Sequence, residues 1–373
     1  MLSRSDRVVV AASAVLTVVA AVLFYSHAAH VATFVVSGLA LAALAALVGR
    51  SVEQVADRLG SGATGVVQSA LGNLPELFVC VFALRDHLTK VVEAAIIGSI
   101  LGNILLVLGL SFMVGGLRNG RQRFDGSRAR TLIALMILAV AAMLVPSLAS
   151  YVHTPAARHE HALSDIAAVV LLVVFALSVP SSLQRGAGEA APGEAAPGEA
   201  APGAAAAGAA PVGEGDGAAV SWPMPVAVAA LAATGVLAAL VSDWFVDALS
   251  PALGTLHISQ AFAGLVIVAI AGNAVENVVG IQLAARNRAD HALSVILNSP
   301  LQIALVLAPV LVLLSPVIGG ASFTLVFPPL LVTTVVGSVL AVSFVIIDGE
   351  SDWLEGAALV GLYAVVAASF WWG

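Results

Sequence analysis

Two glutamates, Glu76 and Glu276, lie 200 positions apart in apolar segments that contain no lysine or arginine. Each comes shortly after a Gly-Asn pair, in the segments Gly72-Asn73-Leu74-Pro75-Glu76 and Gly272-Asn273-Ala274-Val275-Glu276. A carboxylate at membrane depth costs at least about 2.5–3.5 kcal/mol on insertion scales, and such residues mark ion paths and proton relays. The structural alternative is a protonated carboxyl group hydrogen-bonded between helices. Because two glutamates occupy equivalent positions, we favour an ion-binding function.

Neutral oxygen donors accompany both glutamates. Ser99 and Ser299 repeat the offset of 200 positions, and amide side chains lie on the same segments, at Asn73, Asn273, Asn103 and Gln302. Together with the two carboxylates, these oxygens suit a hard cation such as Ca²⁺. The sequence shows no Cys/His/Asp cluster of the zinc or copper type. Candidate backbone or hinge positions, which permit close approach or free a carbonyl group, are Gly72, Gly272, Gly98 and Pro75.

Two neighbouring carboxylates in a site of low dielectric hold either protons or one divalent cation, but not both. Such mutually exclusive occupancy is what proton-coupled antiport requires. We therefore expect Glu76 and Glu276 to bind the transported metal ion and the protons alternately. No resident cofactor is expected.

Membrane spans are the elements that must position these residues. Of the 373 residues, 60% are hydrophobic and 10% are charged, a composition that no soluble domain of this size could cover in water. A span needs about 20 apolar residues, so the sequence predicts an all-α polytopic membrane protein with about eleven transmembrane helices. They are expected at 8–26, 31–49, 63–84, 92–115, 131–149, 163–180, 224–248, 259–284, 291–316, 323–346 and 353–372.

An acidic, low-complexity segment divides the chain. Residues 184–222 are rich in Ala, Pro, Gly and Glu and repeat the pentapeptide Gly-Glu-Ala-Ala-Pro, which favours a disordered linker over a calcium-sensing loop. Around it we expect a leading helix within 1–30 and two five-helix units, 31–183 and 223–373. Because each unit has an odd number of spans, the second enters the membrane from the opposite side. This is the inverted-topology repeat, which permits alternating access to one central site.

The basic residues predict the orientation. Of the 15 lysines and arginines, only Arg85, Lys90 and Arg158 fall in loops opposite the N-terminus. The positive-inside rule then places the N-terminus in the cytoplasm and the C-terminus outside, in the cell's inner (plasma) membrane. The scattered basic residues form no nucleic-acid footprint. We expect the lipid bilayer and inorganic cations as partners, and the sequence makes no prediction of oligomeric state.

The segments 72–116 and 272–315 resemble the two signature repeats of the calcium/proton antiporter (CAX) family, within the calcium/cation antiporter superfamily. That family's second repeat reads roughly Gly-Asn-Ala-Ala-Glu-His, then Gly-Ser-Ser-x-Gln-Ile-Ala-Leu. Here the matching runs are Gly272-Asn273-Ala274-Val275-Glu276 and Ser299-Pro300-Leu301-Gln302-Ile303-Ala304-Leu305. The resemblance implies that Glu76 and Glu276 are shared calcium and proton ligands, in one leading helix plus two inverted five-helix repeats. It also suggests Glu53 as a residue of a cytoplasmic entrance, although a solvated helix face explains Glu53 equally well.

Three positions depart from the family pattern. Leu74-Pro75-Glu76 follows the form that related sodium/calcium exchangers use, Asn277 stands where the family commonly has His, and Asn298-Ser299-Pro300 replaces Gly-Ser-Ser. We therefore expect a non-enzymatic antiporter that exports Ca²⁺ in exchange for H⁺. The alternatives are a Na⁺/H⁺, K⁺/H⁺ or Na⁺/Ca²⁺ exchanger of the same superfamily, or a cation channel in which the same carboxylates form a selectivity ring.

Overall fold

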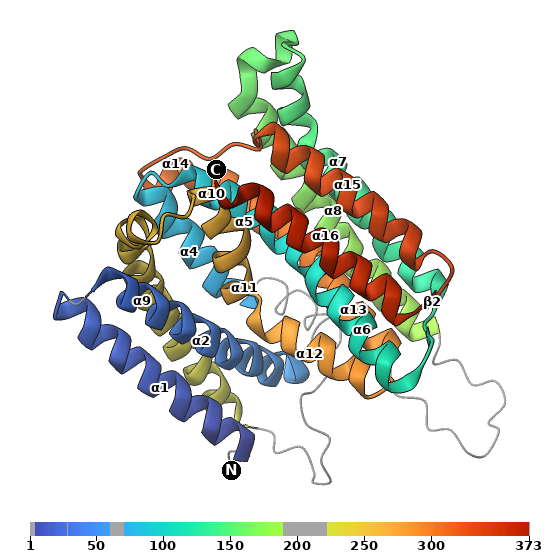
Figure 1. Ribbon diagram of the computed structural model, residues 1–373, viewed down its shortest axis with the longest axis horizontal. Coiled ribbons are helices and arrows are strands. Elements are labelled where there is room, and N and C mark those ends of the chain that lie inside the picture. The colour runs from blue at the N-terminus through green and yellow to red at the C-terminus, as the bar shows by residue number, and fades with distance from the viewer. Residues whose placement is uncertain (1–3, 28, 60–70, 189–221, 373) are drawn as a thin grey trace.

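The computed structural model describes residues 4–27, 29–59, 71–188 and 222–372, and it is almost entirely helical (Figure 1). The helices before the linker are α1 Arg4–Tyr25, α2 His30–Leu59, α4 Leu74–Arg85, α5 Thr89–Leu101, η1 Gly102–Val107, α6 Leu108–Asn119, α7 Gly126–Tyr151, η2 Pro155–His159 and α8 Glu160–Gly188. Those after it are α9 Met224–Leu256, α10 Gln260–Phe262, η3 Ala263–Val268, α11 Ala269–Gly272, α12 Ala274–Ala285, α13 Ala289–Gln302, η4 Ile303–Leu307, α14 Ala308–Ile318, α15 Pro329–Ile346 and α16 Trp353–Trp371. Two short strands are β1 Gln122–Arg123 and β2 Glu350–Ser351.

Long apolar helices make up most of the described chain. Nine of them are long and apolar enough to cross a membrane, and the bent pair Gln260–Gly272 and Glu276–Ala285 would make a tenth. The chain is therefore a nearly all-helical, multi-pass membrane protein, as predicted. The span expected at 63–84 lies partly outside the described residues, so the count of about eleven and the paired five-helix layout stay predictions.

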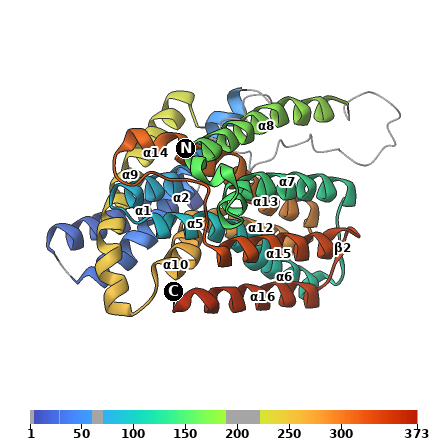
Figure 2. The same ribbon diagram turned by 90° about the horizontal axis from the view of Figure 1, so that it is seen from above.

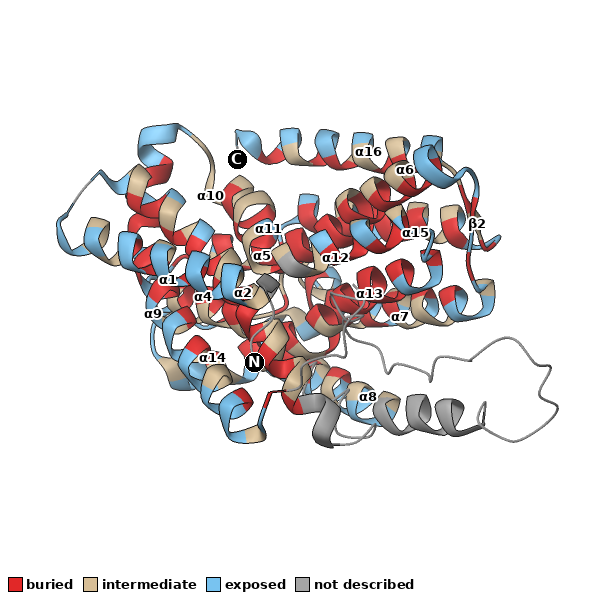
Figure 3. Cartoon of the chain, turned by 90° about the horizontal axis from the view of Figure 1, so that it is seen from below, coloured by how far each residue is buried: buried red, intermediate tan, exposed pale blue. Residues whose placement is uncertain are grey.

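The core is built around the continuous helix formed by α5, η1 and α6. It is buried along most of its length, whereas exposed residues gather on the outward faces of helices such as α1, α8 and α16 (Figure 3). Gly98 of α5 lies where this helix crosses η3, and a Cβ atom there would collide with the backbone of Leu265. Gly264 of η3 stands against the carbonyl group of Val91 in the same way. Small residues thus let two helix backbones approach closely at the centre of the fold.

Helices α1, α2 and α9 lie together at one side of the molecule (Figure 1). Phe34 of α2 stacks on Phe245 of α9, with ring centroids 4.8 Å apart. Arg50 of α2 forms an ion pair with Asp6 of α1 at 2.5 Å. Helix α9 also packs against α4, so this group of helices lies directly over the segment that carries Glu76.

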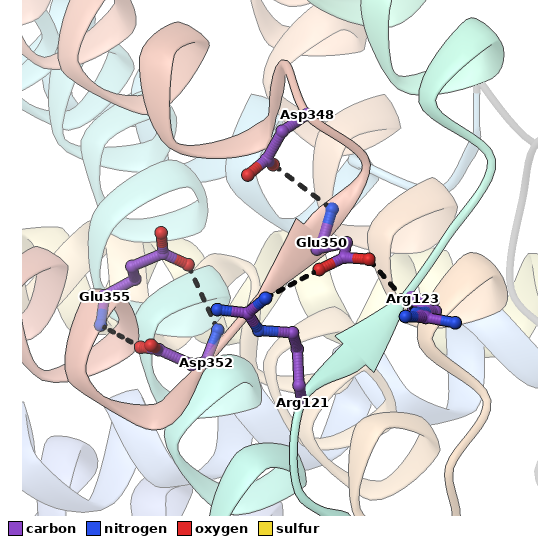
Figure 4. Close-up of polar contacts among 6 residues, drawn as sticks. All are labelled: Arg121, Arg123, Asp348, Glu350, Asp352 and Glu355. Atoms are coloured by element: carbon purple, nitrogen blue, oxygen red, sulfur yellow. Dashed lines mark hydrogen bonds and ion pairs between the residues drawn. The ribbon is translucent and has the colours of Figure 1, made fainter.

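A two-stranded antiparallel sheet joins the α6–α7 turn to the α15–α16 turn. Gln122 pairs with Ser351, and Arg123 pairs with Glu350. The Glu350 carboxylate accepts from Arg121 at 3.0 Å and from Arg123 at 3.1 Å (Figure 4). Exposed ion pairs of this kind contribute at most about 1 kcal/mol each. The sheet therefore serves mainly to fix the path of the two turns.

Helix α6 precedes β1 and helix α16 follows β2, and the two helices lie side by side in Figures 1 and 2. A Cβ atom on Gly109 would lie 2.7 Å from the Gly356 oxygen, and one on Gly356 would lie 2.5 Å from the Gly109 oxygen. At the start of α16, Asp352 and Glu355 form a reciprocal capping box (Figure 4). Close packing and a capped start together hold α16 on the buried central helix.

Two helix boundaries differ from those expected. The span expected at 323–346 begins only at Pro329, because prolines at 328 and 329 disfavour helical backbone before them. The preceding residues 319–328 are non-helical, and the Ser147 hydroxyl donates to the Leu325 carbonyl at 2.8 Å. Helix α8 runs to Gly188, so the first residues of the expected linker are helical; the rest of it, 189–221, lies outside the described residues.

Candidate ion-binding site

A non-helical asparagine directly before each of two helices sets the position of the glutamates. Asn73 (φ −93°, ψ 18°) and Asn273 (φ −104°, ψ 20°) both leave the helical region, and α4 and α12 begin at the next residue. On the second side the axes before and after the break differ by 65°. Glu76 and Glu276 therefore lie in the first turn of a helix, where unpaired N–H groups and the helix dipole favour negative charge.

The repeat in sequence is repeated in local structure. Helix α4 ends at Arg85 and α12 at Ala285, and the helices that follow begin at Thr89 and Ala289. Each pair is again separated by 200 positions. The sequence offset thus corresponds to matching helix starts, matching helix ends and matching positions of the two carboxylates.

A chain of hydrogen bonds crosses from one repeated segment to the other. The Ser99 hydroxyl donates to Glu76 Oε1, and Asn273 Nδ2 donates to Ser99 Oγ at 3.1 Å. The Ser299 hydroxyl donates to Asn273 Oδ1 at 3.1 Å, and Asn103 Nδ2 donates to Ser299 Oγ at 3.1 Å. Five of the predicted site residues therefore form one connected polar network in the centre of the fold.

Burial makes this network sensitive to charge. Glu76, Ser99 and Asn103 are each 1% exposed. Glu76 Oε2 and Asn103 Oδ1 have no hydrogen-bond partner among the described residues. Leaving such acceptors without a donor is costly in a buried setting. Oxygens of this type are ligands for a hard cation.

The second carboxylate lies near the first. Glu276 is half-buried and lies four residues after Gly272. A second link between the segments runs from Asn73 Nδ2 to Gln302 Oε1 at 3.4 Å. Gly272 lies directly against Glu76, because a Cβ atom on it would lie 3.3 Å from the Glu76 Cβ atom.

Two small pockets flank the network. The first is mainly apolar and lies between Glu76 and the α2–α9 pair; its lining residues are Leu41, Pro75, Glu76, Val79, Phe245, Val268, Ala271 and Gly272. The second is more polar, with the lining residues Ser99, Gly102, Asn103, Leu106, Ala269, Ile270, Asn273 and Asn277. Glu76 thus contacts the polar network through Ser99 on one side and lines an apolar pocket on the other. We call Leu41 and Phe245, which close this pocket on the α2–α9 side, the apolar cover.

Most of the predicted site residues come together here, and the exceptions are informative. Glu53, near the end of α2, lines neither pocket. Gly98 lies at the helix crossing described above, not at a break. Sequence reasoning did not include Asn277 among the site residues, although it stands four positions after Asn273, on the same helical face. Leu41 and Phe245 carried no signal, because only the packing of α2 against α9 brings them to the site.

Comparison with known proteins agrees with this architecture. The chain matches the family described as sodium/calcium exchanger protein over residues 29–183 and 226–372. It is 34% identical over 340 residues to a Ca(2+)/H(+) antiporter of Synechocystis sp., with 90% of each chain covered. It is 33% identical over 370 residues to Ca(2+)/H(+) antiporter ChaA of Bacillus subtilis, with 99% of each covered. Among solved structures, native YfkE is similar, with a TM-score of 0.79 and 29% identity over 97% of this chain and 99% of that chain.

Proposed function

The chain belongs to the sodium/calcium exchanger protein family, and from this premise we propose that it is a secondary-active antiporter, not an enzyme, that exports Ca²⁺ in exchange for H⁺. Relatives named Ca(2+)/H(+) antiporter align with nearly the whole chain at 33–34% identity. The site supports the same ion pair, because it combines carboxylates with neutral oxygens, and the described residues that line its two pockets include no Cys, Met or His.

The observation that carries the proposal is the polar network ending at Glu76. It joins residues of both repeated segments and leaves Glu76 Oε2 and Asn103 Oδ1 as acceptors without a donor. A proton on the Glu76 carboxyl group removes its negative charge when no cation is bound. Ca²⁺ held by Glu76 and Glu276 replaces such protons, and Asn103, Ser99 and the amides of the network contribute further oxygens.

Exclusive occupancy then couples the two fluxes. The two carboxylates are compensated either by protons or by one divalent cation, because a buried pair left with both charges uncompensated is strongly unfavourable. Release of one species on one side of the membrane therefore requires uptake of the other before the site can return. The Ser99 hydroxyl keeps Glu76 Oε1 in place through both states.

Alternating access would come from the two repeated segments, arranged as inverted five-helix units around this site. The apolar cover of Leu41 and Phe245 suits a gate, since it separates Glu76 from the α2–α9 side. We place the N-terminus in the cytoplasm and the protein in the cell's inner membrane. The asymmetric distribution of Lys and Arg among the loops supports that orientation.

A flux assay tests the function directly. Everted vesicles or proteoliposomes with an acidic interior contain a pH-sensitive dye, and Ca²⁺, Na⁺ or K⁺ is added in turn. We expect Ca²⁺ to release protons from vesicles with wild-type protein and not from those with Glu276→Gln. Glu93→Gln is the matched control, because Glu93 is a second half-buried glutamate, on α5, that lines neither pocket; it should keep the response.

Other outcomes separate the alternatives. A response to Na⁺ or K⁺ alone would rule out Ca²⁺ as the substrate and would support exchange of that cation for protons. Calcium flux that requires Na⁺ on the opposite side and moves no protons would indicate sodium/calcium exchange. Cation flux that follows the membrane potential without proton movement would indicate a channel.

A further inference from the structure

Helix α12 carries Glu276 at its start and is attached through a break. Asn273 interrupts the helix before it, and the axes on the two sides differ by 65°. A helix joined at such a bend does not have its direction fixed by the preceding helix. The position of Glu276 therefore depends on what holds the other end, at Ala285, which lies about 14 Å away at 1.5 Å per residue.

Two side-chain amides of the first half hold that end. Asn119 Nδ2 and Gln122 Nε2 each donate to the Ala284 carbonyl oxygen at 3.2 Å. Asn119 is the last residue of α6, and Gln122 is the first residue of β1. We call these three residues the amide clasp. It adds two side-chain donors to the last turn of α12, where the Ala284 carbonyl also accepts from the backbone N–H of Asn287 at 3.1 Å.

Gln122 is held firmly in this position. Its residue is 1% exposed, and its side chain lies so close to Gly115 that a Cβ atom there would collide with the amide. Its backbone pairs with Ser351 in the two-stranded sheet shown in Figure 4. The contact with Gly115 and the strand pair thus hold the buried amide where it donates to α12.

The equivalent helix α4, which carries Glu76, is held differently. Its Leu84 carbonyl, 200 positions before Ala284, accepts from the backbone N–H of Ala321 at 2.9 Å. Position 322, which corresponds to Gln122, is an exposed serine. Both glutamate helices are thus held by the turn that follows a long helix of the other half. Among the described residues, side-chain donors from the other half hold the end of α12, whereas a backbone N–H holds the end of α4.

From this difference we propose that Asn119 and Gln122 are positioning residues for Glu276. They hold the far end of α12 so that the carboxylate at its start stays opposite Glu76, and they touch neither the ion nor the proton. The inference rests on the proposed function for its effect on transport. The clasp itself stands on hydrogen bonds that can be tested without transport.

The test uses the full-length protein with both donors removed, as Asn119→Ala/Gln122→Met. Methionine keeps the length of the glutamine side chain and donates no hydrogen bond. We expect the KM for Ca²⁺ in proteoliposomes to rise roughly threefold to tenfold, the factor corresponding to one or two lost hydrogen bonds. The maximal rate per folded molecule should change by less than about twofold on the same reasoning. Amide hydrogen exchange should accelerate within 277–285 and stay unchanged in α4.

Ser322→Ala is the control, because it alters the corresponding position at the other helix and should leave both readouts unchanged. A clasp variant that yields less folded protein with unchanged KM and unchanged exchange in α12 would overturn the inference. If wild-type protein shows no Ca²⁺-dependent flux, the proposed function fails. The exchange measurement then decides the clasp alone: faster exchange confined to α12 supports it, and no change overturns it.

Discussion

Gly272 of one repeated segment packs against the side chain of Glu76 in the other. A Cβ atom on Gly272 would lie 3.3 Å from the Glu76 Cβ atom, 3.4 Å from its Cγ atom and 3.6 Å from its Cδ atom. The glycine of the second Gly-Asn pair therefore forms one wall of the space that the side chain of Glu76 occupies. The place of the Glu76 carboxylate depends on the absence of a side chain at position 272.

This contact predicts the effect of Gly272→Ala. The added methyl group is closer than ordinary van der Waals contact, so Glu76 must shift by a few tenths of an ångström, and overpacking of this kind costs about 1–3 kcal/mol. We expect folded protein with a lowered Tm and a raised KM for Ca²⁺ in vesicle flux. Gly361→Ala in α16 is the control, since open space surrounds that glycine. Equal behaviour of the two variants would contradict a packed wall at Gly272.

Ser299 links the two asparagines of the polar network. It accepts from Asn103 and donates to Asn273, each at 3.1 Å. Ser299→Ala leaves a buried amide N–H and a buried amide oxygen without their partner, and each unsatisfied group costs about 1–3 kcal/mol. We expect a lower midpoint in thermal unfolding and reduced Ca²⁺ flux. Ser369→Ala is the control, because within the described chain the Ser369 hydroxyl donates to the Val366 carbonyl of its own helix and not to the network.

A double-mutant cycle sharpens this prediction. Asn103→Ala and Ser299→Ala remove two partners of the same bond, so their effects on stability should be less than additive. Fully additive losses would mean that the two residues act independently and that the network is not one unit.

The sequence predicted much of this site because the chemistry is repeated. The offset of 200 positions joined Glu76 to Glu276 and Ser99 to Ser299, and apolar length predicted the spans around them. The hydrogen bonds now connect Ser99, Asn273 and Ser299 as one network. What each residue does in transport stays a prediction.

Other features depend on packing that no local pattern encodes. Leu41 and Phe245 reach the site only because α2 and α9 pack together, and Gly98 proves to be a crossing point with η3. The start of α15 at Pro329 was missed for a different reason. The two prolines are visible in the sequence, but the continuous apolar run around them was interpreted as helix although its first part is a buried non-helical segment. Apolar length predicts burial without distinguishing helix from extended chain.

Asp125, in a turn outside the spans, predicts a pH-dependent contribution to stability. Hydrogen bonds from the backbone N–H of Ser127 and the nearby Arg128 hold its pKa below the ordinary value. A depressed folded-state pKa means that the stabilisation is present above the unfolded pKa and is lost as pH falls through the folded value. Asp125→Ala should therefore lower stability by about 0.5–2 kcal/mol at neutral pH, the usual cost of a lost N-cap.

Thermal unfolding of purified Asp125→Ala against wild type, measured at neutral pH and near pH 3, checks this. The difference should shrink at the lower pH. Asp165→Ala is the control, because Asp165 is an exposed residue within α8 that caps no helix start. A difference between wild type and Asp125→Ala that is the same at both pH values would show that the carboxylate's charge contributes nothing to the cap.

Histidines occupy the left-handed position after several helices. Among the described residues, the non-glycine residues with positive φ are His27, His87, His153, His257 and Asn287. His153, exposed and with φ 55°, follows the end of α7. A side chain in this conformation costs about 1–2 kcal/mol, whereas glycine adopts it without that penalty and loses about 0.5–1 kcal/mol through greater freedom when unfolded. We therefore expect His153→Gly to raise the free energy of unfolding by up to about 1 kcal/mol. His153→Ala keeps the Cβ atom and should not stabilise the protein. Chemical denaturation of the two variants and of wild type measures their free energies of unfolding. A glycine variant less stable than the alanine variant would contradict the prediction, because it would show that the backbone conformation at position 153 does not limit stability.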